Sequence, residues 1–392
     1  MTELVFQYTH ASSITSIAGI RQQFSVAENV QMSVFAAEFL RNAKHNLSIL
    51  DDDPPDIKYH PHGYLFLAGP EGAEDMLANH AVQINNGAYV DILEAELLQQ
   101  RYPWLNTEGI LLGAQGAQNE GWFDPLTLLI AMRGKAEFWD ARFIEAEFVD
   151  FNTEKVMHSE GIYDDTGEPI EKARYMIIRT KDGKEKQIRF MYAIIAAGAE
   201  TGDIARRCMN IGTGKAGVRS IPCPIIKRKR YVYVFNCPDG PSVDFPFLVD
   251  PSGVWCRREG LGGNFVCGGN PEPDEEPDTS NADVDYNFFE QRVWPVLRYR
   301  VPAFQNLRIV GAWSYFQDYN YFDQNGIFGR HPYFWNILFA SGFGSTAVQM
   351  APAIGRAMTE QIIDNEFKTI DLTRLGWSRI LGAVPIKEKL VI

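Results

Sequence analysis

The sequence predicts two domains of different sheet type, an α/β domain of the doubly wound kind and a second domain built on a mixed or antiparallel sheet. The apolar run Gln187 to Ala197 ends in Gly198, a pattern typical of a buried parallel strand. Arg230 to Gly269 instead alternates short apolar runs with turn residues, which is typical of antiparallel strands. A length of 392 residues accommodates one large or two medium domains. We therefore predict an α/β plus α+β chain.

Composition excludes several classes of protein. Hydrophobic residues make up 45% and charged residues 22% of the chain, values typical of a globular protein with a large core. The net charge of −13 repels a phosphate backbone, so no nucleic acid is expected as a partner. The five cysteines show no C-x-x-C spacing, which argues against a disulfide framework and a cysteine zinc site. No apolar run approaches the ~18 residues of a membrane span, so none is expected.

The amino-terminal third predicts a loop, a helix and a strand. Gln7 to Phe24 is rich in small residues and is expected to be an extended loop. Ser25 and Glu28 have the spacing of a capping box, which predicts that the next helix begins there. The helix is expected from Val26 to Leu47, and Tyr59 to Ala68 is expected to be a strand.

The middle of the chain predicts a capped helix followed by a hairpin. Asp124 is a good N-cap and Pro125 is favoured at the first helical position, so a helix of about four turns is expected to follow. Strands are expected at Phe143 to Phe151 and Ala173 to Thr180. A hairpin turn is expected at Asp182 and Gly183.

The carboxyl-terminal third returns to alternating strands and helices. Pro271 to Asp285 is acidic and proline-bearing, which predicts a solvated surface loop. Strands are expected at Arg308 to Gln317 and at Tyr333 to Phe339. A helix is expected from Thr346 to Asp364 and contains Pro352, which predicts a kink.

A G-x-G-x-x-G pattern at Gly212 to Gly217 is best interpreted as a loop. A dinucleotide site needs such a turn to follow a strand and open a helix, whose free N–H groups hold the pyrophosphate. Here a helix, Asp203 to Met209, is expected before it, and Pro222 and Pro224 follow it in an extended segment. Gly260 to Gly263 likewise predicts a hairpin turn.

Two polar groupings have ordinary structural interpretations. His60 and His62 lack the third ligand that a catalytic zinc requires, so a surface turn is favoured. The basic run Lys227 to Arg230 is too short for a nucleic-acid surface and is expected to lead polar residues into a strand.

Three glycine-bearing segments predict a ligand site if they converge. They are Ala18 to Arg21, Ala196 to Gly198, and Gly342 to Ser345 before a helix. A helix amino terminus presents N–H donors and partial positive charge, which suits the negative charge that develops at N1 and C2=O of a reduced flavin. A tight strand-to-helix turn remains the alternative at Gly342 to Ser345.

A set of motifs runs along almost the whole chain: AAG at 196–198, PFLVDPSG at 246–253, RREGLGGN at 257–264, DYNYFDQNGIFGRHP at 318–332, GF at 342–343 and APAIGRA at 351–357, with EGWFDP at 120–125, KRYVYVF at 229–235 and FKTIDL at 367–372. In this order the motifs resemble the D-amino-acid oxidase and sarcosine oxidase superfamily of flavoenzymes, and within it a mitochondrial group that assists assembly of respiratory complex I.

The resemblance implies a two-domain flavoprotein with FAD as its cofactor. It implies an FAD-binding domain at 1–56, 120–212 and 325–372, a substrate domain at 57–119 and 213–324, and a tail at 373–392. Arg21 is the candidate catalytic residue, placed to stabilise a hydride-derived anion or to orient a substrate carboxylate; the alternative is an ion pair with an acidic neighbour. The residues implied near FAD are Gly19, Arg21, Phe148, Ala197, Gly198, Gly342, Phe343, Gly344, Thr346 and Gln349.

The sequence departs from the superfamily pattern in two places. The strand, G-x-G-x-x-G turn, helix and second strand that open such proteins are absent, so the doubly wound domain is expected to be incomplete, with exposed strand edges and apolar helix faces. The glycine loop reads GFGSTA, with Thr346 where the superfamily commonly has histidine. Either the sequence is part of a longer chain that also carried a mitochondrial presequence, or it is a product that binds FAD weakly or not at all.

The resemblance leaves two functions open. One is oxidation of a small amine or amino acid by hydride transfer to FAD. The other is a non-catalytic flavin-fold scaffold for complex I subunits or assembly intermediates. In either case the resemblance implies a location on the matrix side of the mitochondrial inner membrane.

Overall fold

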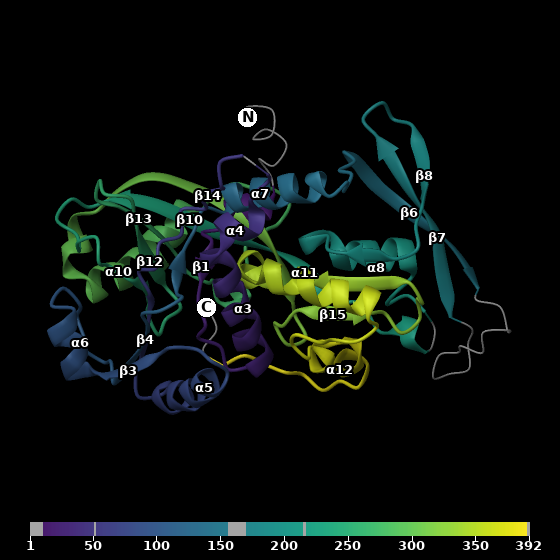
Figure 1. Ribbon diagram of the computed structural model, residues 1–392. Helices are drawn as coiled ribbons and strands as arrows, with labels where there is room; N and C mark the ends of the chain where they lie inside the picture. Colours follow the sequence, from purple (N-terminus) through teal and green to yellow (C-terminus); the bar gives the residue numbers. More distant parts are fainter. Residues whose placement is uncertain (1–10, 51, 156–169, 215–216, 390–392) are drawn as a thin grey trace.

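The computed structural model describes residues 11–50, 52–155, 170–214 and 217–389 (Figure 1). Within these residues, the largest sheet has eight strands in the order β14-β10-β13-β12-β11-β2-β4-β3. The pairing is antiparallel throughout except between β11 and β2. These strands are β14 (Arg308–Asn320), β10 (Ile225–Asn236), β13 (Asn264–Gly268), β12 (Trp255–Glu259), β11 (Phe247–Val249), β2 (Tyr64–Ala68), β4 (Leu112–Gly116) and β3 (Asp91–Glu94).

Each face of this sheet packs into a different core. On β2, Leu65 and Leu67 belong to a core shared with α6 (Ala95–Arg101) and α10 (Trp294–Arg300). Tyr64 and Phe66 point to the opposite face, into a core shared with α3 (Ala27–Arg41) and α11 (Ala347–Ile363). Because side chains alternate along a strand, this second face meets the helical part of the molecule.

A second, smaller sheet carries the only buried parallel pair outside the large sheet in the described ranges. Its order is β15 (Ile327–Arg330), β16 (Ile337–Ser341), β9 (Ala193–Ile195), with β16 and β9 parallel. The sequence predicted one strand over Gln187 to Ala197, which is wrong in extent: its first residues belong to β8 (Glu185–Arg189), in another sheet. Gly198 follows β9 as expected, with φ of 53°.

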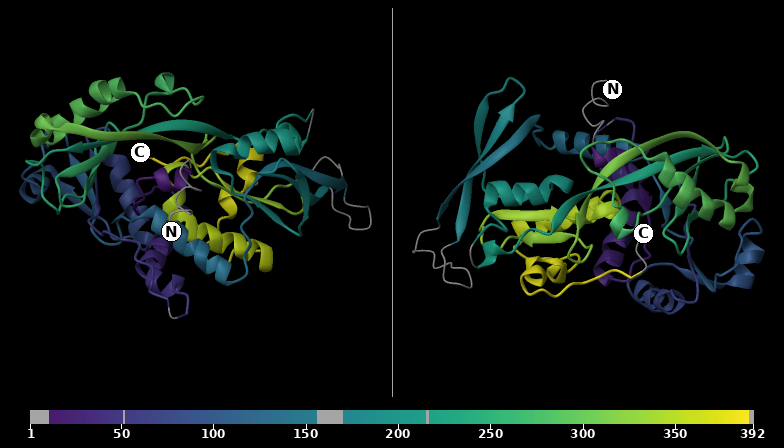
Figure 2. Two further views of the ribbon diagram at one scale, coloured as in Figure 1. Left: turned by 90° about the horizontal axis from the view of Figure 1, so that it is seen from above. Right: turned by 180° about the vertical axis from the view of Figure 1, so that it is seen from behind.

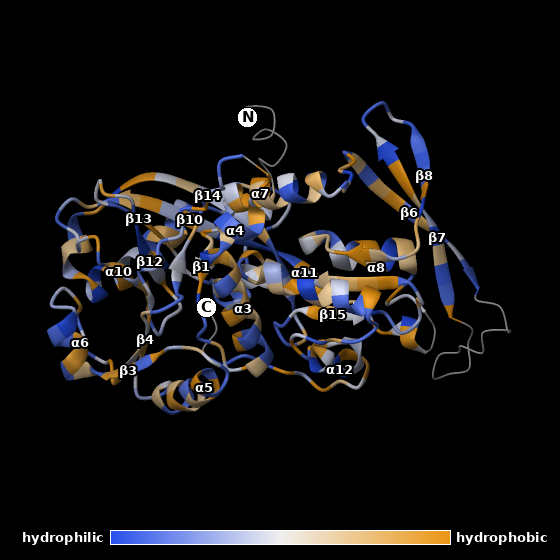
Figure 3. Ribbon diagram, viewed as in Figure 1, coloured by the Kyte–Doolittle hydropathy of each residue, from blue (hydrophilic) through white to orange (hydrophobic). Residues whose placement is uncertain are grey.

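The third sheet, β6 (Ala146–Lys155), β7 (Glu171–Thr180) and β8, extends away from the rest of the molecule (Figures 1 and 2). The predicted hairpin at Asp182 and Gly183 is confirmed, since β7 and β8 pair antiparallel on either side of it. Figure 3 shows β8 coloured mostly hydrophilic, in agreement with its exposure.

The predicted amino-terminal helix is present but divided, and its predicted cap is wrong. The structure has α3 and then α4 (Ala43–Leu47), separated at Asn42. Ser25 donates through its N–H and hydroxyl to Glu388, and Glu28 pairs with Arg374. A capping box is absent here because both of its side chains have partners near the carboxyl end.

The loop expected over Gln7 to Phe24 is wrong in part, since α2 (Ser12–Thr15) and β1 (Gly19–Ile20) lie within it, whereas the predictions around α7, α11 and α8 are confirmed. Asp124 Oδ1 accepts hydrogen bonds from the N–H groups of Leu126 and Thr127 and caps α7 (Pro125–Phe138). The helix after the glycine loop is α11, with Pro352 inside it. The helix before Gly212 is α8 (Thr201–Met209), and β10 follows the G-x-G-x-x-G pattern, so the loop interpretation is confirmed at its described residues; 215–216 lie outside them. Gly260 to Gly263 connects β12 to β13 as a hairpin.

The remaining elements complete the molecule. Strand β1 (Gly19–Ile20) pairs with β5 (Gly121–Trp122), which brings the first predicted glycine segment against the start of α7. No helix in the described residues combines the length and apolarity needed to cross a membrane. The other helices are α2 (Ser12–Thr15), α5 (Ala73–Asn85), α9 (Tyr286–Phe288), a π-helical segment (Phe289–Val293) and α12 (Trp377–Leu381).

Candidate functional site

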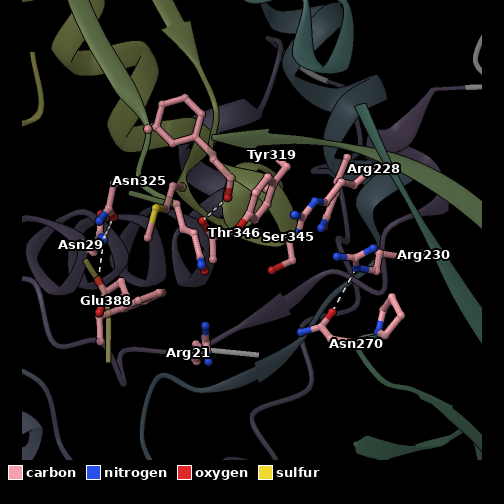
Figure 4. A pocket seen from close by; sticks show the side chains of 18 of the residues that line it. Arg21, Asn29, Arg228, Arg230, Asn270, Tyr319, Asn325, Ser345, Thr346 and Glu388 are labelled. Carbon is pink, nitrogen blue, oxygen red and sulfur yellow. Dashed lines mark hydrogen bonds between the residues drawn. The ribbon is translucent and has the colours of Figure 1, made fainter. Parts of the chain in front are cut away.

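Two neighbouring cavities meet at Arg21, between the large sheet and the amino end of α11. The first, the central cavity, has a volume of about 220 Å³ and is lined by Arg21, Arg228, Arg230, Glu276 and Glu388 among others (Figure 4). The second, the aromatic cavity, has a volume of about 70 Å³ and is lined by residues that include Gly19, Arg21, Tyr64, Phe247, Trp255, Tyr315 and Gln349.

Arg21 is a buried cation with an unused donor. Its side chain is only 5% exposed, and Nη1 has no hydrogen-bond partner among the described residues. The guanidinium lies over the rings of Phe24 and Phe66, at 4.8 and 5.1 Å from their centroids. Burial lowers the pKa of Arg21, against the raising effect of nearby acidic groups. Buried donors without partners are rare, so Nη1 marks a place for an acceptor from outside the chain.

Gln349, on the first turn of α11, fixes the Arg21 backbone. Its Oε1 accepts a hydrogen bond from the Arg21 N–H at 2.9 Å. Its Nε2 is buried and has no partner among the described residues. The structure thus brings together two predicted residues, and each leaves one donor free beside the cavities.

A buried carboxylate supports the loop that carries Arg21. Glu120 accepts hydrogen bonds from the Gln22 N–H at 2.6 Å and from Gln23 Nε2 at 2.9 Å. Burial raises the pKa of Glu120 to about 8, although these bonds and Arg21 act in the opposite direction. The role of Glu120 could not be predicted from its motif alone, because its environment depends on packing against Gly116 and Tyr64.

The wall of the aromatic cavity leaves no room for a side chain at position 19. A Cβ atom at Gly19 would lie 1.8 Å from Tyr64 Oη, so any side chain there displaces the tyrosine ring. Tyr64 itself stacks on Phe247 with 4.1 Å between ring centroids. Close packing against Tyr64 therefore explains why glycine occupies position 19.

The central cavity is lined by two arginines of β10. Arg228 and Arg230 point to the same face as Val232, which belongs to the core shared with α3 and α11. Both contact Glu276, and Arg230 Nε also donates to Asn270 Oδ1 at 3.1 Å (Figure 4). The prediction that Lys227 to Arg230 only leads polar residues into a strand is therefore wrong for Arg228 and Arg230. They lie inside a strand, and their i, i+2 spacing is the signal that places both on one face.

The predicted role of the Gly342 to Gly344 amides is corrected by Asp318. The N–H groups of Gly342, Phe343 and Gly344 donate to the Asp318 carboxylate at 2.5, 3.2 and 3.1 Å. Burial raises the pKa of Asp318, and these three bonds oppose the shift. The donors expected to face a flavin are thus engaged by a side chain of β14. The Thr346 hydroxyl likewise donates to the Phe343 carbonyl at 2.8 Å.

A third cavity, the apolar cavity, lies along α11 with a volume of about 580 Å³. Its lining includes Ala196, Gly198, Gly344 and Ser345, together with apolar residues of α11. Among the described strands, β9 pairs only with β16, so its other edge is open next to this cavity. The open edge of β9 and the apolar residues of α11 therefore both face this cavity.

The three glycine-bearing segments converge on adjoining cavities and not on one. Arg21 and Gly344 line the central cavity, whereas Gly198 and Gly344 line the apolar cavity. Phe148 lies on β6 against Phe151 and lines none of the three cavities, and Ala197 packs into a hydrophobic core beside the apolar cavity. Gly344 and Ser345, at the amino end of α11, therefore connect the two halves of the site.

The histidine pair does not form a metal centre in the described part of the chain. No group of three potential metal-ligating side chains occurs there. The ring of His62 stacks on Trp122 with 5.0 Å between centroids.

Comparison with known proteins places the chain in a family. A family model described as FAD dependent oxidoreductase matches residues 7–361. The chain belongs to the FAD-dependent oxidoreductase family. It is 43% identical to FAD-dependent oxidoreductase domain-containing protein 1 of Xenopus laevis, over 98% of this chain and 77% of that protein. It is 39% identical to the homologue of that protein in Drosophila melanogaster, over 97% of this chain and 73% of the relative.

Solved structures share the fold at low sequence identity. The L-proline dehydrogenase of P. horikoshii aligns with a TM-score of 0.74 and 18% identity, over 95% of this chain and 89% of that one. The glycine oxidase of Geobacillus kaustophilus aligns with a TM-score of 0.70 and 16% identity, over 94% and 88%. The predicted fold class and the assignment of FAD as the cofactor are confirmed by these findings and the family model.

The residues present are compatible with FAD. The apolar cavity offers an uncharged wall along α11, as an aromatic ring system requires. Arg21 Nη1 and Gln349 Nε2 are buried donors without partners beside the adjoining cavities. Gly198 lines the apolar cavity, and nothing lies within 4 Å of the position that a Cβ would take there. A ligand can therefore approach the Gly198 backbone closely.

Proposed function

We propose that this protein is an FAD-dependent oxidoreductase that acts on a small amine or amino acid with a carboxylate group. When bound, FAD supplies the two-electron acceptor for oxidation of a C–N bond. The observation that carries the proposal is the unpartnered Nη1 of the buried Arg21, with the unpartnered Nε2 of Gln349. Together they offer two donors to a carboxylate, and a charge-assisted bond to the guanidinium is the stronger of the two.

Each part of the site has a role in this proposal. Arg21 holds and orients the carboxylate, and Gln349 fixes the Arg21 backbone. The aromatic cavity excludes water from the reacting carbon. Asp318 holds the loop at the amino end of α11 in place through three backbone N–H groups. Glu120 fixes the Gln22 N–H that follows Arg21.

The residues that the resemblance implies near FAD are assigned to parts of the cofactor. Gly19 and Arg21 are assigned to the reactive face of the flavin, and Ala197 and Gly198 to the pyrophosphate or ribose. Phe148 is assigned to the adenine end. Thr346 and Gln349 are assigned to the pyrimidine edge. Gly342, Phe343 and Gly344 position the loop, because their N–H groups donate to Asp318.

Fold neighbours support the substrate class. They include enzymes named for L-proline, glycine, iminodiacetate and L-amino acids, which are amines that carry a carboxylate. A substrate of this class matches the donor pair at Arg21 and Gln349.

Flavin spectroscopy tests the proposal. The protein is loaded with FAD, the absorbance between roughly 350 and 500 nm is recorded without oxygen, and glycine, sarcosine, L-proline and L-glutamate are added in turn. Bleaching of the flavin band by one such amine is expected, and amines without a carboxylate should be poorer. Bound FAD that no carboxylate-bearing amine reduces would contradict catalysis, and failure to take up FAD would support a product that does not bind the cofactor.

A non-catalytic role in complex I assembly is the second candidate, together with a location on the matrix side of the mitochondrial inner membrane. An exposed apolar cluster at the carboxyl end of α7 favours a protein partner: Phe138, Trp139, Phe143 and Ile144 are 40 to 72% exposed. Replacing Trp139 and Phe143 with Gln should release complex I assembly intermediates from the protein purified out of mitochondria. Retention of those intermediates, or fractionation of the protein outside mitochondria, would contradict this role.

A further inference from the structure

We propose that the substrate carries two acid groups and that the second binds between Arg228 and Arg230 in the central cavity. This inference rests on the proposed function, in which Arg21 holds the first carboxylate. It names the substrate class as a dicarboxylic amine or amino acid. Three observations carry it: the direction of the two β10 arginines, the carboxylate that already lies between them, and the charge of the cavity.

The position of the two arginines follows from strand geometry. β10 pairs with β14 along Ile225–Asn236, and its side chains alternate between the two faces of the sheet. Arg228 and Arg230 share the face of the central cavity with Arg21. Arg230 is only 6% exposed, and Arg228 stacks on Tyr319 at 3.4 Å from the ring centroid. Stacking and pairing hold both guanidinium groups in fixed positions.

A carboxylate of the chain itself occupies the space between these arginines. Glu276 forms two bonds with Arg230, Nη1 to Oε2 at 2.9 Å and Nη2 to Oε1 at 3.0 Å. Its Oε1 also lies 2.9 Å from Arg228 Nη1. This paired geometry is the one that arginine offers to any carboxylate. Glu276 therefore shows where a second acid group of a ligand binds.

Glu276 belongs to a largely exposed segment. It lies in Pro271 to Asp285, which the sequence predicted to be a solvated loop, and most of its residues are exposed. The prediction is confirmed for most of the segment and corrected at Glu276, which turns inward. The flanking Glu275 contacts Arg292 on the surface instead. A ligand acid group between the arginines takes the place of the Glu276 carboxylate.

The charge of the cavity favours an anion. Its lining includes three arginines, Arg21, Arg228 and Arg230, against two carboxylates, Glu276 and Glu388. Glu388 is held by Ser25 and Asn29 on the opposite side (Figure 4). An amino acid with one carboxylate and a protonated amine has no net charge, whereas a second carboxylate gives it one negative charge. When Glu276 gives up its place, the three arginines face only Glu388, and this positive excess favours the ligand with the second carboxylate.

Two diagnostic anions of equal carbon number test the proposal without catalysis. Sodium glutarate, with two carboxylates, and sodium pentanoate, with one, are titrated by calorimetry into the FAD-loaded full chain. Glutarate is expected to bind at least about tenfold more tightly, since charge-assisted bonds at a second subsite contribute on the order of 1.5 kcal/mol or more. In Arg228→Gln this preference should fall below about threefold with pentanoate affinity unchanged.

The loop variant separates ligand binding from loop anchoring. Glu276→Gln removes the charge that competes for the arginines, so glutarate should bind several-fold more tightly than to the wild type. Glu275→Gln is the matched control in the same loop and should change nothing. If Glu276 only anchors the loop, Glu276→Gln leaves the glutarate to pentanoate ratio unchanged, which overturns the proposal.

The outcomes also distinguish this inference from the proposed function. Equal binding of both anions overturns the second subsite and leaves the Arg21 carboxylate site intact. Absence of binding by either anion overturns both. Flavin bleaching by an amine with one carboxylate, at the same efficiency as by its dicarboxylic analogue, contradicts only the substrate class named here.

Discussion

Two buried arginines show how differently this fold uses the same side chain. Arg379 and Arg21 are each 5% exposed. Arg379 makes paired bonds to Asp323, at 2.6 and 3.1 Å, and donates to the carbonyls of Leu375, Gly376, Asn325 and Gly326. Arg21 instead leaves Nη1 without a partner beside two cavities. Breaking the Arg379 pair would leave a buried charge without a partner, whereas the unpartnered Nη1 of Arg21 indicates a place for a ligand.

Two buried carboxylates repeat the contrast. Burial pushes the pKa of Glu360 upward, but hydrogen bonds from the Thr369 hydroxyl and from the N–H groups of Lys368 and Thr369 lower it to about 2. Glu120, behind Arg21, has a pKa raised to about 8 because burial outweighs its hydrogen bonds. Glu360 on α11 is thus stabilised as a carboxylate by its hydrogen bonds, whereas burial disfavours the charged form of Glu120 behind Arg21.

Replacing each arginine in turn should produce the largest difference in the free energy of unfolding. Arg379→Met leaves Asp323 buried without its ion-pair partner, and a loss of about 3–5 kcal/mol in the free energy of unfolding is expected. Arg21→Met removes a cation that lacks a full set of partners, and a change within about 1 kcal/mol is expected. Urea unfolding of both variants measures the difference. Equal losses would show that Arg21 is a structural ion like Arg379.

The pH dependence of stability should show that the pKa values of the two carboxylates are shifted in opposite directions. In the folded state the pKa of the Glu120 carboxyl is about 8, whereas the ordinary pKa of a glutamate carboxyl is 4.5. The folded state therefore binds more protons between these values, and its stability from this group falls as pH rises, by up to ~1.4 kcal/mol per pH unit. Urea unfolding between pH 5 and pH 8 measures the slope.

Glu120→Gln supplies the control for that slope. The variant cannot titrate, so its stability curve should be flatter between about pH 5 and 8 than that of the wild type. The pKa of Glu360 is shifted in the opposite direction. Its contribution to the free energy of unfolding is therefore present above pH 4.5 and is lost as pH falls towards 2. A wild-type slope identical to that of Glu120→Gln would contradict the raised pKa.

A methyl group at Gly19 tests the close packing of the aromatic cavity. Gly19→Ala places Cβ 1.8 Å from Tyr64 Oη. The ring must move, and an expected loss of about 1–3 kcal/mol is typical of overpacking. Gly262→Ala is the matched control, because nothing lies within 4 Å of the Cβ position there. Thermal unfolding of the two variants should differ, and equal midpoints would show that Tyr64 moves freely.

The sequence predicted the local features of the fold better than its distant contacts. The Asp124 cap of α7 was predicted correctly because its partners lie two and three residues away. The Ser25 and Glu28 cap was wrong because Glu388, which is distant in sequence, takes the Ser25 donors. The strand predicted to end at Ala197 was too long because its first residues pair with β7.

The same limit applies to the candidate site. Arg21 and Gln349 were predicted from a resemblance, and the structure brings them into hydrogen-bond contact. Arg228 and Arg230 were missed although strand spacing carries the signal. No local pattern indicates that Asp318 reaches the Gly342 to Gly344 amides, since the register of β14 beside β10 sets its position. Long-range register and loop docking are the information that a sequence pattern lacks.

The affinity of the FAD-loaded protein for pentanoate, measured by calorimetry in the wild type and in Arg21→Met, tests the central claim most directly. Arg292→Met, at an exposed surface arginine, is the control. If Arg21 Nη1 holds a ligand carboxylate, Arg21→Met should weaken binding by about 10- to 100-fold, and Arg292→Met should leave it unchanged. Equal affinity in the wild type and Arg21→Met would contradict the account.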